Sequence, residues 1–130
     1  MVRSIHRSRR IQRHVHELAI VDALIDQVQR EVQRSNHAGR VVGVDLVVGR
    51  LCGAHADSIR FAFEMLAPGT LVEWATLRIA EPKPVCHCRA CGSCTEVDDV
   101  TIACSDCGSV DVSIEGGRDL LLQSIELDDG

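Results

Sequence analysis

The chain has 130 residues, of which 45% are hydrophobic and only 2% aromatic, and its net charge is −5. This length fits one domain, or one small domain with an inserted module, and the core must be aliphatic. Residues 1–14 contain five arginines and no acid, which leaves nine basic against 19 acidic residues elsewhere, a net charge of −10. Such an acidic body excludes a typical nucleic-acid-binding protein, whose binding face is basic.

Targeting signals and cysteines narrow the class further. No apolar run approaches the roughly 18 residues that cross a bilayer, and no apolar stretch of the secretory type follows the N-terminal arginines. The sequence therefore predicts a cytoplasmic protein without a membrane partner. Seven cysteines in such a protein, six of them between positions 86 and 107, indicate metal or thiol chemistry rather than disulfides.

The first part of the chain predicts a disordered segment and then a helix. Residues 1–14 follow neither a helical nor a strand pattern, so we expect a disordered extension. Apolar residues then recur at the spacing of one helix face, with polar residues between them. They are Leu18, Val21, Leu24, Ile25, Val28 and Val32. Stop signals from Asn36 to Gly39 end the predicted helix.

Two further segments predict a strand and a second helix. The stretch RVVGVDLVVG alternates with a period of two, which predicts a strand with Val42, Val44, Leu46 and Val48 on one face. After a loop, Asp57 or Ser58 can cap a helix that runs through Leu66. Its inward face is predicted to carry Ile59, Phe63 and Leu66.

The remaining segments predict more strands around a stiff connection. TLRIA reads as a strand, and Glu81-Pro82-Lys83-Pro84 follows as an extended hinge, since proline disfavours helix in the residue before it. Residues 110–114 alternate like a short strand. After Gly116-Gly117, the stretch RDLLLQSIEL has the composition of a strand that could return to the first sheet.

The cysteine-rich module carries two copies of C-x-x-C-G, which are separated by 12 residues. In each copy, two intervening residues let both thiolates point at one ion, and the glycine permits the positive φ of the tight turn. Facing each other, the two copies form a tetrahedral site of the structural-zinc type. The predicted zinc ligands are Cys88, Cys91, Cys104 and Cys107.

Other interpretations of the module remain open at this stage. Cys91 and Cys94 also form a C-x-x-C pair, although without a following glycine. The symmetric pairing favours Cys88 with Cys91 and leaves Cys86, His87 and Cys94 as bystanders, while Cys52 fits packing. A redox pair, unrelated buried thiols or a rubredoxin-type iron site are the alternatives. A closed four-cysteine zinc site has no open position for a substrate, and no catalytic motif stands out, so we expect no enzyme.

The order of motifs resembles the HypA/HybF family of hydrogenase nickel-incorporation proteins. The resemblance covers residues 15–130 and rests on an H-E-L opening helix, a G-V-x-L-x-x-G strand, R-F-A-F-E, C-x-C-x-x-C, C-x-x-C-G-S and a final SIEL. It implies an α/β nickel-binding domain, a small β-sheet packed with two helices, formed by residues 15–83 plus 117–130. An inserted Cys₄ zinc-ribbon module would occupy residues 84–116.

The resemblance also implies a function. A member of this family would be a metallochaperone that binds Ni(II) and delivers it to the large subunit of [NiFe]-hydrogenase, together with the GTPase HypB. Zinc would be structural and nickel transported. The alternatives are a zinc-ribbon interaction module without a nickel role and a rubredoxin-like electron carrier.

The nickel ligand implied by the resemblance is His16. Family members begin Met-His-Glu, and His16-Glu17 match this motif, but Val15 stands at the initiator position. A GUG codon encodes valine internally and can also start translation with methionine. We therefore expect Val15 to be the true start of the protein and residues 1–14 to be untranslated sequence. The other interpretation is a genuine extension that adds His14 as a ligand. His55 is a further candidate ligand of the same metal.

Overall fold

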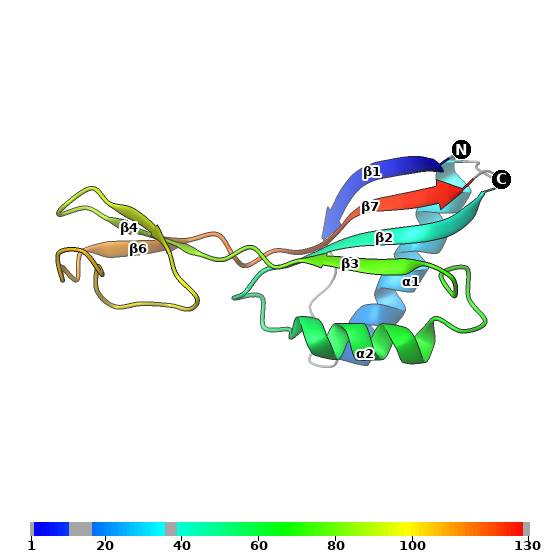
Figure 1. Cartoon of the computed structure of the whole chain (residues 1–130), viewed down its shortest axis with the longest axis horizontal. Helices are drawn as coiled ribbons and strands as arrows, with labels where there is room; N and C mark the ends of the chain where they lie inside the picture. The colour runs from blue at the N-terminus through cyan, green and yellow to red at the C-terminus, as the bar shows by residue number, and fades with distance from the viewer. Residues whose placement is uncertain (1, 11–16, 36–38, 129–130) are drawn as a thin grey trace.

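The computed structural model describes residues 2–10, 17–35 and 39–128. Within these residues, two helices and seven strands form a four-stranded sheet and a separate three-stranded sheet (Figure 1). The two sheets lie at opposite ends of an elongated molecule and are joined by two extended segments. The helices belong to the end with the larger sheet. The predicted α/β class with a small sheet and two helices is therefore confirmed.

The larger sheet has the strand order β1-β7-β2-β3. Strands β2 and β3 pair in parallel, whereas β7 runs antiparallel to both β1 and β2. The C-terminal strand thus returns to the centre of the first sheet, as its composition predicts. The bounds are β1 Val2–Arg10, β2 Arg40–Val48, β3 Thr76–Ala80 and β7 Leu120–Asp128.

Helices α1 (Glu17–Ser35) and α2 (Ala56–Leu66) pack on one face of this sheet (Figure 1). The buried cluster between helices and sheet is almost entirely aliphatic, with Phe63 as its aromatic member, as the composition predicts. Its largest fully buried side chains include Ile20, Leu24, Leu46, Ile59, Leu122, Ile125 and Leu127. Removal of this apolar surface from water is the main force that holds the α/β domain together.

Two local predictions are wrong. Val41 is buried in β2 while Val42 is only partly so, because the pairing with β7 shifts register between Val41 and Gly43. Such an extra residue in one strand interrupts the strict alternation that the sequence pattern assumes. Helix α2 is capped by His55 rather than by Asp57 or Ser58, and His55 makes no side-chain capping hydrogen bond.

The prediction of a disordered segment at residues 1–14 is wrong for residues 2–10. These residues form β1, which pairs with β7 from Val2–Asp128 to Arg10–Leu121. The backbone groups at the edge of β7 pair with an incoming strand whatever its side chains are, so no apolar alternation is required. His14, Val15 and His16 lie outside the described residues.

The smaller sheet has the order β5-β4-β6 and is antiparallel throughout. Its strands are β4 Val85–Cys88, β5 Cys94–Glu96 and β6 Val112–Glu115. We call this sheet and its loops the ribbon. Residues 81–84 lead into the ribbon and residues 116–119 lead out of it, without helix or strand structure in either segment.

The loop after β2 is hydrogen-bonded to both connecting segments. The backbone N–H of Arg50 donates to Pro82 O at 3.1 Å, and that of Leu51 donates to Gly117 O at 2.6 Å. Gly117 has a φ of 70°, and a Cβ there would lie 2.8 Å from the backbone nitrogen of Pro84. The two segments therefore cross at a point where only glycine fits.

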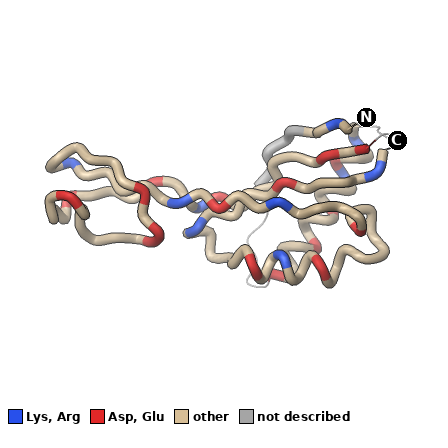
Figure 2. Tube along the Cα trace, in the orientation of Figure 1, with Lys and Arg blue, Asp and Glu red and all other residues tan. Residues whose placement is uncertain are grey.

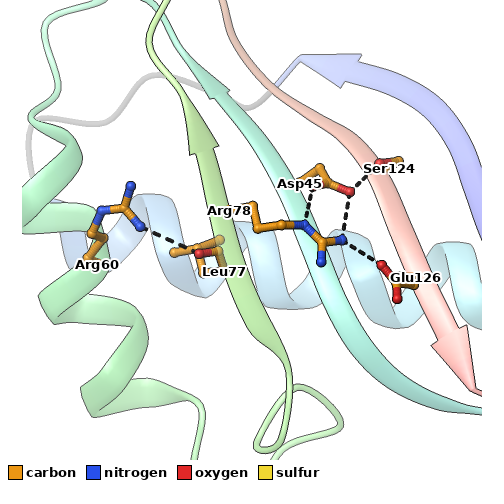
Figure 3. A network of polar contacts seen from close by, with 6 residues as sticks. All are labelled: Asp45, Arg60, Leu77, Arg78, Ser124 and Glu126. Carbon is orange, nitrogen blue, oxygen red and sulfur yellow. Dashed lines mark hydrogen bonds and ion pairs between the residues drawn. The ribbon is translucent and has the colours of Figure 1, made fainter.

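A polar network covers part of the sheet face that the helices leave open (Figure 3). The Arg78 guanidinium donates from Nε to Asp45 at 2.6 Å and from a terminal nitrogen to Glu126 at 2.8 Å. Ser124 donates to the same Asp45 carboxylate. The network links β2, β3 and β7 side by side. Both carboxylates raise the pKa of Arg78, first through these hydrogen bonds.

Neither described helix is long and apolar enough to cross a membrane. Acidic residues are distributed over the ribbon, the connecting segments and α2 (Figure 2). This distribution agrees with the negative charge that the composition assigns to the chain after residue 14.

Candidate metal centre

Four cysteines meet at the end of the ribbon. Cys88 and Cys91 lie at the turn between β4 and β5, and Cys104 and Cys107 lie in the loop that precedes β6. Their sulfur atoms are all within 4.8 Å of one another. The structure therefore brings together the four residues that the sequence predicts as zinc ligands.

The two turns have matching backbone geometry. The N–H of Gly92 donates to Cys88 O and that of Gly108 to Cys104 O, each at 2.9 Å. The two glycines have φ values of 77° and 76°, a left-handed conformation that other residues adopt at a cost. Each C-x-x-C-G repeat thus folds into the tight turn that its sequence predicts.

The sulfur separations fit one tetrahedral ion. Cys88 and Cys107 sulfurs are 3.6 Å apart, and those of Cys91 and Cys104 are 3.7 Å apart. Four sulfurs bonded to zinc at about 2.3 Å in a tetrahedron would be about 3.8 Å apart. Cys88 and Cys104 are buried while Cys91 and Cys107 are exposed, so the site lies at the surface but would present its ion with a complete set of sulfurs.

Hydrogen bonds shift the pKa values of the clustered cysteines in different directions. The Ser93 hydroxyl, followed by the backbone amides of Cys107 and Asp106, lowers the pKa of Cys104 to about 6. Ser93 also lowers the pKa of Cys91. The Ser109 backbone favours the Cys107 thiolate, but the thiols of Cys88 and Cys91, together with burial, raise the pKa of Cys107 to about 12. Adjacent negative charges repel one another, and a divalent cation would relieve that repulsion.

The other cysteines lie outside the cluster. Cys86 is buried on β4, and burial, followed by the neighbouring thiols, raises its pKa. Cys94 is exposed on β5, beside His87. Cys52 belongs to the buried core of the α/β domain, so its predicted packing role agrees with its position.

The predicted nickel ligand His16 precedes the first described residue of α1. The neighbouring Glu17 lines a groove of about 430 Å³ between the beginning of α1 and one side of α2. Apolar residues dominate this groove, and three of them are strongly exposed. Its lining residues are Glu17, Leu18, Asp57, Ser58, Phe61, Ala62 and Met65.

His55 lies near the same region. As the cap of α2 it lines a second cavity, of about 620 Å³, which reaches Glu81 and Asp98 at the junction with the ribbon. Asp57 and Ser58 line both cavities. The start of α1 and the His55 loop therefore adjoin the same end of α2, on the side that faces the ribbon.

Comparison of sequences identifies the family. Residues 15–127 match the family described as hydrogenase/urease nickel incorporation, metallochaperone, hypA. The chain belongs to the HypA family. It is 39% identical over 114 residues to the hydrogenase maturation factor HypA of Chlorobaculum tepidum, which covers 88% of this chain and 100% of that protein. The corresponding protein of Nitrosospira multiformis is 36% identical over 113 residues, 87% of this chain and 97% of its own length.

Solved structures of HypA proteins have the same fold. The solution structure of the nickel metallochaperone HypA from Helicobacter pylori superposes with a TM-score of 0.57 at 25% identity, covering 86% of this chain and 97% of the other. A second HypA solution structure gives a TM-score of 0.60 at 23% identity and covers 91% and 100%. Membership of the family supports a role for this chain in hydrogenase maturation, and the four-cysteine cluster of the ribbon is a metal-binding site.

Proposed function

We propose that this HypA-family chain binds Ni(II) and delivers it to [NiFe]-hydrogenase, and that a structural Zn(II) is held by Cys88, Cys91, Cys104 and Cys107. The observation that carries the proposal is the family match that opens at residue 15, directly before His16-Glu17, and runs through the four-cysteine cluster. One end of the chain then offers a nickel ligand, and the ribbon offers a site suited to a permanent ion.

The zinc assignment is supported by the donor set. Four thiolates at tetrahedral spacing suit zinc, which has no preference for another geometry and no redox chemistry. When bound, zinc cross-links the two turns. Because its four positions are filled by protein sulfurs, no substrate can reach the ion, and we assign the chain no catalytic activity.

The nickel assignment is supported by the position of His16. Ni(II) favours nitrogen ligands such as imidazole in square-planar geometry. His16 directly precedes α1, and its neighbour Glu17 lines a groove beside Asp57 at the start of α2. We propose that the nickel site lies at this end of the helices, with His55, the N-cap of α2, as a further candidate ligand.

The proposed partners follow from the family. Nickel delivery in the cytoplasm would use the GTPase HypB and end at the hydrogenase large subunit. A nucleic-acid partner is not proposed, because the chain after residue 14 has a net charge of −10.

Nickel titration of the His16→Ala variant tests the proposal. We expect tight nickel binding to be lost while one zinc per chain remains, because His16 lies far from the ribbon sulfurs along the chain. His6→Ala, in β1, is the matched control for the loss of any histidine. Nickel binding by His16→Ala as tight as that of the parent would show that the site is misplaced, and bound iron in place of zinc would contradict the zinc assignment.

A second titration examines the residues before the family match. A chain that begins Met-His16-Glu17 should bind nickel more tightly than the 130-residue chain if a free amine is a ligand, because each tenfold gain equals about 1.4 kcal/mol. His14→Ala in the long chain controls for a substitute imidazole. Equal affinities in all three proteins would rule out an amine ligand, and an intact mass from the native host that includes Met1 to His14 would contradict the start at Val15.

A further inference from the structure

The ribbon has a second cluster of side chains that carry metal-ligating atoms, on the opposite face of β4 from Cys86 and Cys88. Side chains alternate along β4, so Cys86 and Cys88 share one face while Val85 and His87 share the other. His87 is paired directly with Cys94 on β5 and with Ser113 on β6. Pairing of three strands therefore gathers residues that are far apart in the sequence.

Two contacts organise this second cluster. The Cys94 sulfur lies 3.0 Å from His87 Nδ1, and His87 Nε2 lies 3.2 Å from a carboxylate oxygen of Glu115. A carboxylate that accepts a hydrogen bond from one ring N–H leaves the other ring nitrogen unprotonated and able to bind a metal, as in many carboxylate–histidine–metal sites. Here that other nitrogen points at the thiol. Glu115 thus orients His87 toward Cys94.

We propose that Cys94 and His87 form a second, open metal site for Ni(II), with Glu115 as the residue that positions the imidazole. The identity of the ion rests on the proposed function, whereas the site itself rests on these contacts. As the metal–sulfur bond forms, the Cys94 thiol releases its proton to solvent, and His87 Nδ1 donates its lone pair. No electron transfer is involved.

The separation of the two ligand atoms is short enough for neighbouring ligands of a square-planar ion. With bonds of about 2.1 Å to nitrogen and about 2.3 Å to sulfur, a tetrahedral ion requires about 3.6 Å between them. The observed 3.0 Å corresponds to an angle at the metal of about 90°. Such an angle joins neighbouring ligands of square-planar Ni(II). The four-cysteine cluster, at 3.6 and 3.7 Å, has the tetrahedral spacing instead.

The second site is accessible and incomplete, which suits an ion that is passed on. Cys94 is exposed, and the side chains of His87 and Glu115 are 39% and 68% exposed. Two protein ligands leave positions for water or for donors from another molecule. The closed four-cysteine site, in contrast, leaves none.

Nickel titration of the zinc-loaded chain tests the second site, with His16→Ala as the background to remove the proposed N-terminal ligand. Thiolate bonded to Ni(II) absorbs in the near ultraviolet, whereas thiolate bonded to zinc does not. We expect this absorbance to appear while zinc stays at one per chain, and to be lost in Cys94→Ser and His87→Ala. Glu115→Gln should weaken binding about 10- to 100-fold, and Glu96→Gln, an exposed carboxylate on the same sheet, should leave it unchanged.

Three results would overturn the proposal. They are absence of the thiolate–nickel absorbance in the zinc-loaded His16→Ala chain, its persistence in Cys94→Ser, and its growth in step with zinc release, which would place nickel in the four-cysteine site. None of them depends on nickel at His16. Conversely, the His16→Ala variant could bind nickel as tightly as the parent chain and keep the Cys94-dependent absorbance. That result would contradict the proposed N-terminal site and support this one.

Discussion

The α/β domain and the ribbon are stabilised by different means. Every residue of the buried hydrophobic cluster described in the structure belongs to the α/β domain. In the ribbon, the buried positions include Cys86, Cys88 and Cys104, while Val100, Ile102 and Val110 are exposed. A module of about 30 residues that leaves its aliphatic side chains in water needs another source of stability. The four-cysteine cluster supplies it if metal is bound.

The largest effect should come from removing one ligand sulfur. Cys107→Ser should release zinc and unfold the ribbon, because binding of a structural zinc is worth about 10–16 kcal/mol at neutral pH and is coupled to folding. The α/β domain should keep its structure. Zinc content and amide hydrogen exchange, residue by residue, measure both outcomes.

Cys94→Ser is the matched control for this substitution, since Cys94 is exposed and lies outside the cluster. It should retain zinc and the slow exchange of β4. Full zinc retention in Cys107→Ser would remove the contrast between the two regions.

A core truncation should have the opposite pattern. Leu24 is fully buried in α1, and Leu24→Ala should lower the free energy of unfolding of the α/β domain by about 2–5 kcal/mol. Zinc content should not change. Leu18→Ala, on the exposed part of the same helix, should cost less than about 0.5 kcal/mol. Equal effects of the two substitutions in denaturant titrations would contradict the assigned core.

Acid should affect the ribbon before the core. Zinc can bind only thiolates, so a thiol whose pKa is raised, as that of Cys107 is to about 12, releases its proton when zinc enters at pH 7. Below the pKa of about 6 that Cys104 has, one further proton must be displaced. Apparent zinc affinity should therefore fall at least tenfold per pH unit near neutrality and more steeply below about pH 6. Competition with a chromophoric chelator across pH 5–8 measures the slope, and a flat profile would contradict it.

The same contrast explains which features the sequence revealed. The C-x-x-C-G turns could be predicted because their geometry is fixed by neighbouring residues and by the ion that they suit. The sequence predicts Val42 on the buried face of β2, whereas Val41 is the buried residue. The shift in register arises from pairing with β7, which the pattern of β2 alone does not reveal. Strand β1 was missed for a similar reason, because edge pairing uses backbone groups. His87 and Cys94 looked like bystanders, and only the pairing of β4, β5 and β6 brings them to Glu115.

The crossing of the two connecting segments should show whether the regions are coupled. Gly117→Ala meets two penalties, a positive φ of 70° and a Cβ 2.8 Å from the Pro84 nitrogen. Gly116→Ala meets only the first, since its φ is 78° and no atom lies within 4 Å. The conformational penalty is about 1–2 kcal/mol, so Gly117→Ala should destabilise more than Gly116→Ala.

The difference between the two variants isolates the contact at the crossing. Amide chemical shifts should change in the loop after β2 and in both connecting segments for Gly117→Ala, and remain local for Gly116→Ala. Identical stability and shifts in the two variants would show that the crossing does not constrain the ribbon relative to the α/β domain.

The smallest effect should come from the polar network on the open face of the sheet. Arg78 joins Asp45 and Glu126 (Figure 3), but its side chain is 44% exposed and those of the carboxylates are 30% exposed. Solvent screens such ion pairs, which typically contribute about 0–1 kcal/mol. Arg78→Gln should therefore lower the free energy of unfolding by no more than about 1 kcal/mol, and less at high salt. Arg78→Lys keeps the charge but loses the fork that reaches two carboxylates, so it should fall between Gln and the parent. Arg78→Gln could instead lower the free energy of unfolding as much as Leu24→Ala does. The α/β domain would then depend on its polar network as much as on its aliphatic core, and burial of aliphatic side chains would not explain how its stability differs from that of the ribbon.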